Sequence, residues 1–313
     1  MSAIAEPLSE EDGALKVYDV SLVPADPPAE LLYQHKPDFL RSARELFRRG
    51  EVIFTLAERD IRAQYKQAVL GIAWALLTPL ISLALLFILA KNVKGFSIGG
   101  NVPVILTMYV GLITFGLFGG AIGGGSNSLV ANKALMAKSH FPRECFPLSQ
   151  ILGSAFTSLM ATLPLAILFA INGFAPRLAS FWAPLYVAIE IPFMIGLVLL
   201  VSAVIVQMRD LQQIIPIVMP LVMLITVLEP LNQEMHKHLV PNARFVLGHG
   251  WLRDVYCFVN PMAPIVDNVR SSVLLGFGPQ WSTLMLALCG SLVYLVVGFV
   301  VFKRLEVNFA DLT

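Results

Sequence analysis

Long apolar stretches, separated by short charged ones, dominate the hydrophobic pattern of the chain. No charged residue occurs between Lys66 and Lys91, and none occurs between Lys94 and Lys133. About 20 apolar residues, rising roughly 1.5 Å each in a helix, cross the hydrocarbon core of a membrane. We therefore predict six transmembrane helices, at residues 69–90, 103–125, 146–171, within 177–209, at 211–228 and at 281–302.

The composition agrees with this interpretation. Of the 313 residues, 57% are hydrophobic and 14% are charged, and the mean hydropathy is +0.73. Soluble domains carry about 25% charged residues, which cover their surface. The predicted fold class is therefore an all-α integral membrane protein. The fifth predicted span is the least regular, because it is short and contains Pro216 and Pro220.

Basic residues beside the spans predict the orientation in the membrane. Six spans place both termini on one side, and nine basic residues then lie on that side: Arg59, Arg62, Lys66, Lys133, Lys138, Arg143, Arg209, Lys303 and Arg304. The short loops of the opposite side contain three: Lys91, Lys94 and Arg177. Cytoplasmic loops carry the excess of Lys and Arg in membrane proteins. We therefore expect both termini in the cytoplasm.

The residues before the first span divide into a tail and two helices. Residues 1–36 carry seven acidic side chains and two lysines, which predicts a disordered acidic tail in the cytoplasm. Residues 37–50, PDFLRSARELFRRG, predict a basic amphipathic helix in the membrane interface. A second helix over 51–67 is expected to lead directly into the first span. Residues 68–313 then form the six-span domain.

Two segments outside the spans have patterns of their own. The loop 126–145 predicts a short helix that begins at Ser126 or Asn127 and carries apolar residues such as Leu129. Such a helix either transmits force from a soluble partner or is only a connector anchored in lipid. The segment 229–280 is too charged to span a membrane and too apolar for an ordinary loop. It predicts two short re-entrant helices on the outer side, with a cap on the surface as the alternative.

Four stretches of sequence resemble a known family. The first and most specific is ERDIRAQYKQAVLGIAWALLTPL at 58–80, and the others follow in order: FPRECFPL (141–148), RDLQQIIPIVMP (209–220) and NPMAPIVDNVRSSVLLG (260–276). They resemble ABC transporter permeases for polysaccharide and polyol-phosphate export, which include the Wzm-type O-antigen and the teichoic-acid permeases. The resemblance covers roughly 37–313 and excludes the acidic tail.

The resemblance implies a homodimer in the bacterial cytoplasmic membrane, paired with two copies of a separate ABC ATPase. ATP and Mg²⁺ would bind to that partner, because this chain has no G-x-x-x-x-G-K-[ST] phosphate loop and needs no cofactor of its own. The nearest glycine cluster, GGAIGGG at 119–125, is interpreted as a helix surface for close packing, with a flexible helix end as the alternative.

The loop after the second span supplies the candidate contacts with the ATPase. These are Asn132, Lys133, Lys138 and Arg143. The resemblance implies a coupling helix in this loop. If the charges instead only set topology, reversing them would impair membrane insertion.

Basic residues at the junction with the first span are the candidate entrance for the substrate head group. They are Arg59, Arg62, Tyr65 and Lys66. A lipid-linked glycan carries phosphate, which Arg binds with forked hydrogen bonds. The alternative is ordinary contact with lipid head groups.

A few residues within the spans are candidates for lining a channel. They are Tyr109, Phe115, Phe118 and Glu190. Sugars stack on aromatic rings, although aromatic residues also gather at any membrane interface. An acid within a span costs about 2.5–3.5 kcal/mol on insertion scales, so Glu190 should face a cavity or a partner.

These observations lead to one main hypothesis and two alternatives. We expect the membrane-spanning permease of an ATP-driven exporter that moves a polyprenyl-linked polysaccharide across the membrane, with membrane lipids and no nucleic acid among its partners. One alternative is a permease for a smaller cargo, such as a drug or a lipid. The other is a polytopic enzyme acting on polyprenyl-linked sugars, for which we identify neither catalytic residues nor a metal site.

Overall fold

A computed structural model describes residues 46, 48–66, 69–92, 103–138, 142–228 and 250–306. All of them belong to one compact unit, Phe39–Thr313. The predicted acidic tail, most of the basic helix at 37–50 and the first part of the segment 229–280 lie outside the described residues.

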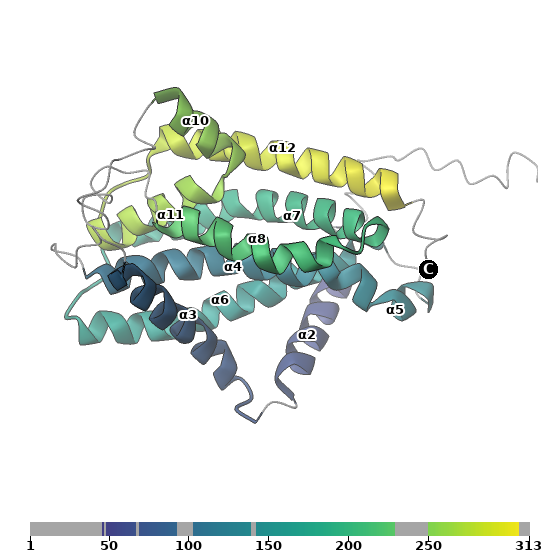
Figure 1. Cartoon of the computed structure of the whole chain (residues 1–313), viewed down its shortest axis with the longest axis horizontal. Helices are drawn as coiled ribbons and strands as arrows, with labels where there is room; N and C mark the ends of the chain where they lie inside the picture. Colours follow the sequence, from purple (N-terminus) through teal and green to yellow (C-terminus); the bar gives the residue numbers. More distant parts are fainter. Residues whose placement is uncertain are drawn as a thin grey trace, which may run out of the picture. The chain divides into compact units, whose positions relative to one another are not determined.

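Six long helices lie at the positions of the six predicted spans (Figure 1), and that all six cross a membrane stays a prediction. They are α3 (Ala73–Asn92), α4 (Val104–Ala131), α6 (Cys145–Ile171), α7 (Ala183–Gln207), α8 (Leu211–Leu228) and α12 (Trp281–Glu306). Within the described part of the chain, four helices are long and apolar enough to cross a membrane. They are α4, α6, α12, and α7 together with the 3-10 turn η2 (Leu178–Trp182) that precedes it. The apolar parts of α3 and α8 are shorter.

Helix α4 lies at the centre of the bundle. It packs against α6, α7, α8 and α3, and its buried side chains point in all directions around its axis. Helices α6 and α12 instead expose one apolar face, formed by Leu159, Leu163, Ile167, Leu292, Val293 and Val296 among others. A helix that is apolar on all sides suits either a protein core or a lipid environment, so burial separates the central helix from those that face outward.

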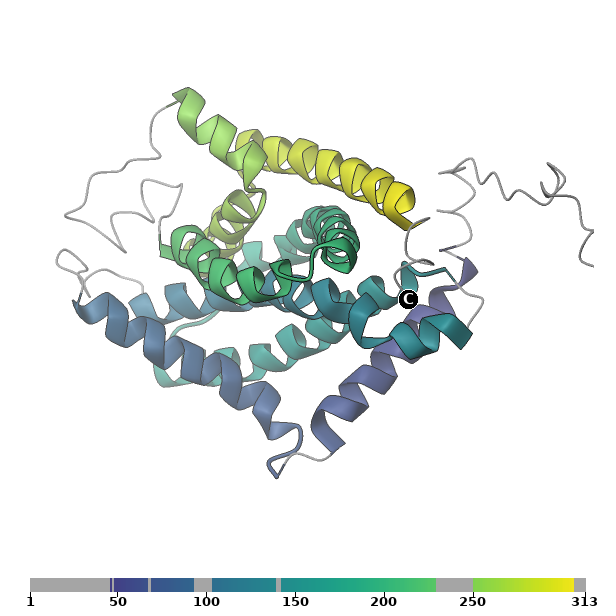
Figure 2. The same ribbon diagram turned by 45° about the vertical axis from the view of Figure 1, so that its right-hand side comes forward.

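Helices α7 and α12 run side by side with their backbones in contact (Figures 1 and 2). A Cβ atom on Gly298 would overlap the carbonyl of Gly196, and one on Gly196 would overlap the backbone of Tyr294. The Tyr294 ring also packs edge-on against Phe193, with 4.9 Å between the ring centroids. Small residues allow this close approach of helices in membranes, and they make α7 and α12 a tightly joined pair.

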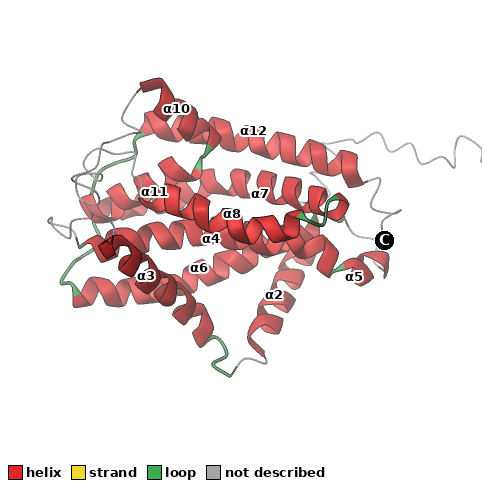
Figure 3. Ribbon diagram, viewed as in Figure 1, coloured by secondary structure: helices red, strands yellow, loops and turns green. Residues whose placement is uncertain are grey.

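Every described element is helical (Figure 3). One connection corrects a prediction. Helix α2 (Gly50–Lys66) does not continue directly into α3, because residues 69–72 form a turn in which Gly71 has a φ of +51°. Glycine adopts this left-handed conformation without steric cost, so the chain changes direction between α2 and α3.

A second correction concerns the loop after α4. The predicted start of a new helix at Ser126 or Asn127 is wrong, because α4 continues to Ala131. Nothing in that stretch interrupts the helix until Asn132, whose side chain donates a hydrogen bond to the Ser128 carbonyl at 2.9 Å. The short helix α5 (Lys133–Lys138) then follows.

The segment before α12 contains α10 (Gly250–Val259), α11 (Met262–Arg270) and a π-helical turn, η4 (Ser271–Leu275). Helix α11 is almost wholly buried against α4, α7, α8 and α12, whereas α10 buries only Cys257 and packs on α12. Two short helices therefore exist here, as predicted. Their depth in the membrane, and so their re-entrant character, stays a prediction.

Candidate functional site

A groove of about 690 Å³, lined by polar and apolar groups, lies between α2, α4 and α6. Small residues form much of its wall, among them Gly116, Gly120, Gly124 and Gly153. Amides and hydroxyls supply most of its polar groups: Gln64, Asn127, Asn132, Ser149, Gln150, Ser154 and Thr157. The groove therefore offers uncharged hydrogen-bonding groups and bare helix backbone.

The two charged residues in the groove, Arg59 and Asp60, neutralise each other. An Arg59 guanidinium nitrogen donates to the Asp60 carboxylate at 2.6 Å and to the Asn132 side chain at 2.8 Å. The Gln150 amide donates to the other Asp60 oxygen at 2.6 Å. This network fastens α2 to the end of α4 and to α6, and it leaves the groove without net charge.

Glycines of the 119–125 cluster let α6 and α7 approach α4. A Cβ atom on Gly120 would lie 3.0 Å from the Ser154 hydroxyl, and one on Gly124 would lie 2.7 Å from the Gln150 amide oxygen. On another side, Gly125 packs against Val198 of α7 and the Pro147 carbonyl. The close-packing interpretation of this cluster is confirmed, since the cluster lies within the continuous helix α4.

An ion cluster joins the start of α6 to the end of α12. Glu144 is fully buried and forms an ion pair with Lys303, which also pairs with Glu306 at 2.9 Å. Arg143 donates a hydrogen bond to the Glu306 carbonyl at 2.8 Å. Burial raises the pKa of the Glu144 carboxyl, the nearby Glu306 raises this pKa further, and Lys303 lowers it. The charge on Glu144 therefore depends on Lys303.

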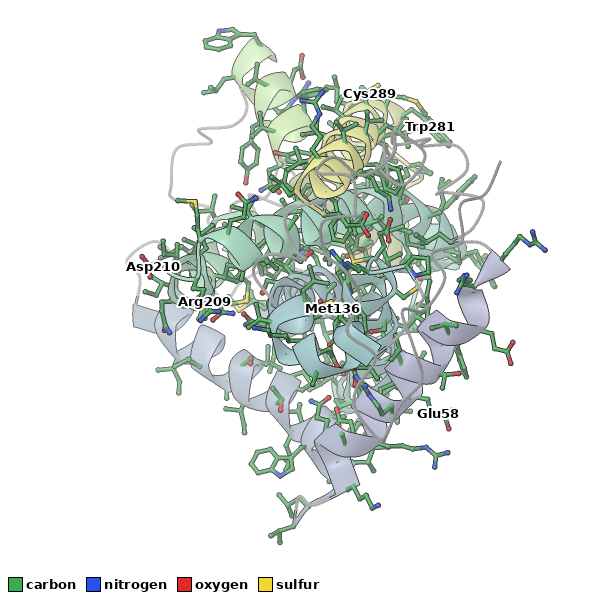
Figure 4. The ribbon with its side chains drawn as sticks, turned by 90° about the vertical axis from the view of Figure 1, so that its right-hand side faces the viewer. Glu58, Met136, Arg209, Asp210, Trp281 and Cys289 are labelled. Carbon is green, nitrogen blue, oxygen red and sulfur yellow. The ribbon has the colours of Figure 1, made fainter. Side chains whose placement is uncertain are left out.

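An apolar cluster lies beside these charges and joins several helix ends. Its buried members are Leu56, Leu129, Cys145, Phe146, Leu199, Ala203 and Phe302. Leu135 and Met136 of α5 pack against it. Figure 4 views the structure from this end and labels Met136 on α5, Glu58 on α2, and Arg209 and Asp210 between α7 and α8. The cluster thus connects α5 with α2, α6, α7 and α12.

Residues 51–233, which contain the whole groove and α5, match the family model described as ABC-2 type transporter. This match covers more than half of the chain. The chain belongs to the ABC-2 type transporter family. As a member with several apolar helices, it is a multi-pass membrane component of a transporter.

Two curated relatives of this ABC-2 chain share the name O-antigen export system permease protein RfbA. The one from Myxococcus xanthus is 25% identical over 274 residues, which cover 87% of this chain and 99% of the relative. One from Klebsiella pneumoniae is 22% identical over 264 residues, which cover 84% of this chain and 95% of the relative. The similarity therefore extends beyond the part matched by the family model.

The entrance candidates of the ABC-2 chain lie on α2, but only Arg59 lines the groove. Arg62 is exposed and pairs with Glu58 of its own helix. The ring of Tyr65 lies 6.5 Å from that of Phe156 on α6, and Lys66 is exposed at the end of α2. Whether these residues meet a substrate or lipid head groups stays a prediction.

The coupling candidates separate into two groups. Asn132 ends α4 and accepts the hydrogen bond from Arg59, and Lys133 and Lys138 begin and end α5. Arg143 instead contacts the end of α12. Sequence reasoning missed the cluster formed by Glu144, Lys303 and Glu306, because Glu144 is about 160 positions away from the other two and only the fold brings them together.

The channel candidates are packed within the chain. The Tyr109 hydroxyl donates to the Ala161 carbonyl at 3.1 Å, and the Phe115 ring packs edge-on against that of Phe118 at 5.5 Å. Glu190 is fully buried, and its carboxyl oxygens have no hydrogen-bond partner among the described residues. Phe118 alone of the four lines a described cavity, an apolar one of about 430 Å³ between α4, α7, α8 and α10. A role in the path stays a prediction for all four.

Proposed function

We propose that this chain is the permease subunit of an ATP-driven exporter that moves a lipid-linked polysaccharide across the bacterial cytoplasmic membrane. Family membership makes the chain a transporter component. Its similarity to the relatives named as O-antigen export permeases extends over nearly the whole length of those relatives. Those names support a glycan as the cargo.

The groove between α2, α4 and α6, whose polar groups are mostly uncharged, is the observation that carries the proposal. A sugar chain presents many hydroxyls and little charge, so it needs donors and acceptors spread along a surface. The groove supplies amides, hydroxyls and bare backbone, and its one Arg–Asp pair is internally neutralised. A drug-like cargo would instead favour a mostly apolar and aromatic pocket.

The assembly belongs to the same proposal. Two copies of the chain form the path, and two copies of a separate ABC ATPase bind ATP and Mg²⁺ and contact α5. The six spans are α3, α4, α6, α7, α8 and α12, with both termini in the cytoplasm. The position of α5, the α7–α8 turn and the basic end of α12 at one end of the bundle supports this orientation (Figure 1), because Lys and Arg are enriched in cytoplasmic loops.

Depletion of the protein tests the cargo directly. Lipid-linked glycans are extracted from depleted and undepleted cells and compared by mass spectrometry. We expect a long glycan to accumulate on its polyprenyl carrier, on the cytoplasmic side of the membrane. Re-expression of the chain should clear it. An unchanged pool of lipid-linked glycans would overturn the polysaccharide proposal.

A smaller apolar cargo is the second candidate, and the cavity between α4, α7, α8 and α10 is the observation that favours it. Its lining is almost wholly apolar and includes Phe118 and Phe193, whose rings stack at 5.0 Å. Under this proposal, depletion would leave the glycan pool unchanged and would alter the retention of an apolar dye in the cells.

A further inference from the structure

The ion cluster at the start of α6 connects two parts of the chain that the proposed function treats separately. On one side is the segment directly after α5, which supplies Arg143 and the buried Glu144. On the other is the end of the last span, which supplies Lys303 and Glu306. A buried ion pair is strongly destabilising to break, because one charge is left without compensation. The two parts should therefore move together.

The apolar contacts around the cluster reinforce this connection. Leu135 and Met136 on α5 pack against the cluster that contains Phe302 of α12, and Phe299 and Leu305 pack there too. A displacement of α5 can therefore reach the end of α12 through this apolar cluster, to which both helices contribute side chains.

Helix α12 can carry such a displacement to the opposite end of the molecule. Its 26 residues form a rod of roughly 39 Å at about 1.5 Å per residue, and its backbone is in contact with that of α7 at Gly196 and Gly298. At the other end, Gly290 of α12 packs against the Phe258 carbonyl of α10 and against Pro261. The pair α7–α12 therefore links α5 to α10 and α11 with little free space.

We propose that the cluster of Arg143, Glu144, Lys303 and Glu306 is the joint that transmits movement of α5 to the α7–α12 pair, and through it to α10 and α11. The inference rests on the proposed function in one respect, that a partner ATPase moves α5. The four residues are positioning residues, because they act through α12 and do not touch the cargo.

Charge exchange across the joint tests the proposal in vesicles that contain the chain and its ATPase. We expect Glu144→Lys and Lys303→Glu each to lower export per ATP hydrolysed about tenfold, within the usual range for coupling between sites, while ATP hydrolysis continues. The double variant Glu144→Lys/Lys303→Glu should recover most of the coupling. Arg304→Glu is the matched control, because Arg304 is the next residue along α12 and is exposed. Full coupling in the single variants would overturn the proposal.

A second measurement follows the end of the α7–α12 pair that contacts α10, and it does not depend on the cargo. Trp251 on α10 is 75% exposed, and Trp251→Cys in a Cys289→Ser background gives a site for a thiol reagent. We expect ATP to change its labelling rate, and Glu144→Gln to abolish that change while keeping the shape of the side chain. Glu144→Gln also decides the question if the reversed charges prevent membrane insertion.

The outcomes separate the joint from the cargo. In one outcome, the unmodified chain exports no glycan, yet ATP changes its labelling rate and Glu144→Gln removes that change. This outcome would overturn the polysaccharide proposal and support the joint. Labelling that ATP changes equally in Glu144→Gln and in the unmodified chain would overturn the joint. A labelling rate that ATP never changes would also overturn it, because the far end would then not move.

Discussion

At the scale of single residues, Arg270 shows how one buried cation can hold three helices together. Its guanidinium is fully buried on α11 and donates hydrogen bonds to the carbonyls of Thr107 on α4, at 2.9 Å, and Val227 on α8, at 2.7 Å. Gly111 makes room for it, since a Cβ atom there would overlap the guanidinium. Val227 lies in the last turn of α8, where carbonyls lack partners within the helix.

Replacement of Arg270 by Met should therefore destabilise the protein. The two carbonyls would lose their donors, and hydrogen bonds to a charged group contribute about 1.5–3 kcal/mol each. We expect the free energy of unfolding to fall by about 3 kcal/mol, measured as a lower thermal unfolding midpoint of the purified protein. Arg253→Met is the control, because Arg253 is partly exposed and, within the described part of the chain, pairs only with Asp254 at 3.5 Å. Equal midpoints for the two variants would contradict the role of Arg270.

The sequence predicts the residue types of the site better than their partners. Arg59 follows from the basic residues before the first span, but its partner Asn132 lies at the end of α4, and Gln150, which donates to the neighbouring Asp60, comes from α6. Arg143 is recognisable as a basic loop residue, yet its contact with α12 depends on how the ends of the helices meet. Pairings of this kind are set by tertiary packing and leave no local pattern.

At the scale of helices, the contact of α7 with α12 depends on the absence of side chains at two positions. Gly298→Val would place a branched side chain where the Gly196 carbonyl lies. Overpacking of a well-packed interface costs about 1–3 kcal/mol, so we expect a lower unfolding midpoint and less protein in the membrane.

Gly123→Ala on α4 is the matched control for that substitution. Nothing lies within 4 Å of the Cβ position at Gly123, so an alanine meets no obstacle there. Because alanine favours a helix over glycine by up to about 1 kcal/mol, this variant should be as stable as the unmodified chain or slightly more so. An equal loss in both variants would show that α7 and α12 tolerate separation.

The positions of the helices follow from the sequence, whereas some of their ends do not. Stretches without charge predict α4, α6 and α12 well, and a stretch with the single acid Glu190 predicts α7, because the hydrocarbon core disfavours charge along the whole span. The end of α4 is missed by six residues, since Ser126 and Asn127 are compatible with either a helix interior or a cap. The turn at 69–72 is missed because Gly71 alone gives no signal that φ is positive there.

At the scale of the whole molecule, the sequence predicts an all-α membrane protein but not the groove. The groove requires α2, α4 and α6 to meet with their small residues facing one another, and this depends on which faces of three helices turn inward. The glycine spacing at Gly116, Gly120 and Gly124 places these residues on one face of α4. That pattern indicates close packing in general, and only the fold shows that a polar groove lies beside it.

A pair of glycine substitutions can decide whether the groove belongs to the path of the cargo. Gly116 on α4 and Gly278, in the connection before α12, both have nothing within 4 Å of their Cβ positions, and both are exposed, but only Gly116 lines the groove. A leucine at Gly116 would therefore fill the groove without strain, whereas a leucine at Gly278 would leave it open. We expect Gly116→Leu to lower glycan export about tenfold, which corresponds to roughly 1.4 kcal/mol, while membrane level and ATP hydrolysis stay unchanged. Equal export by Gly116→Leu and Gly278→Leu would mean that the cargo passes elsewhere, because only the first variant places its added side chain in the groove.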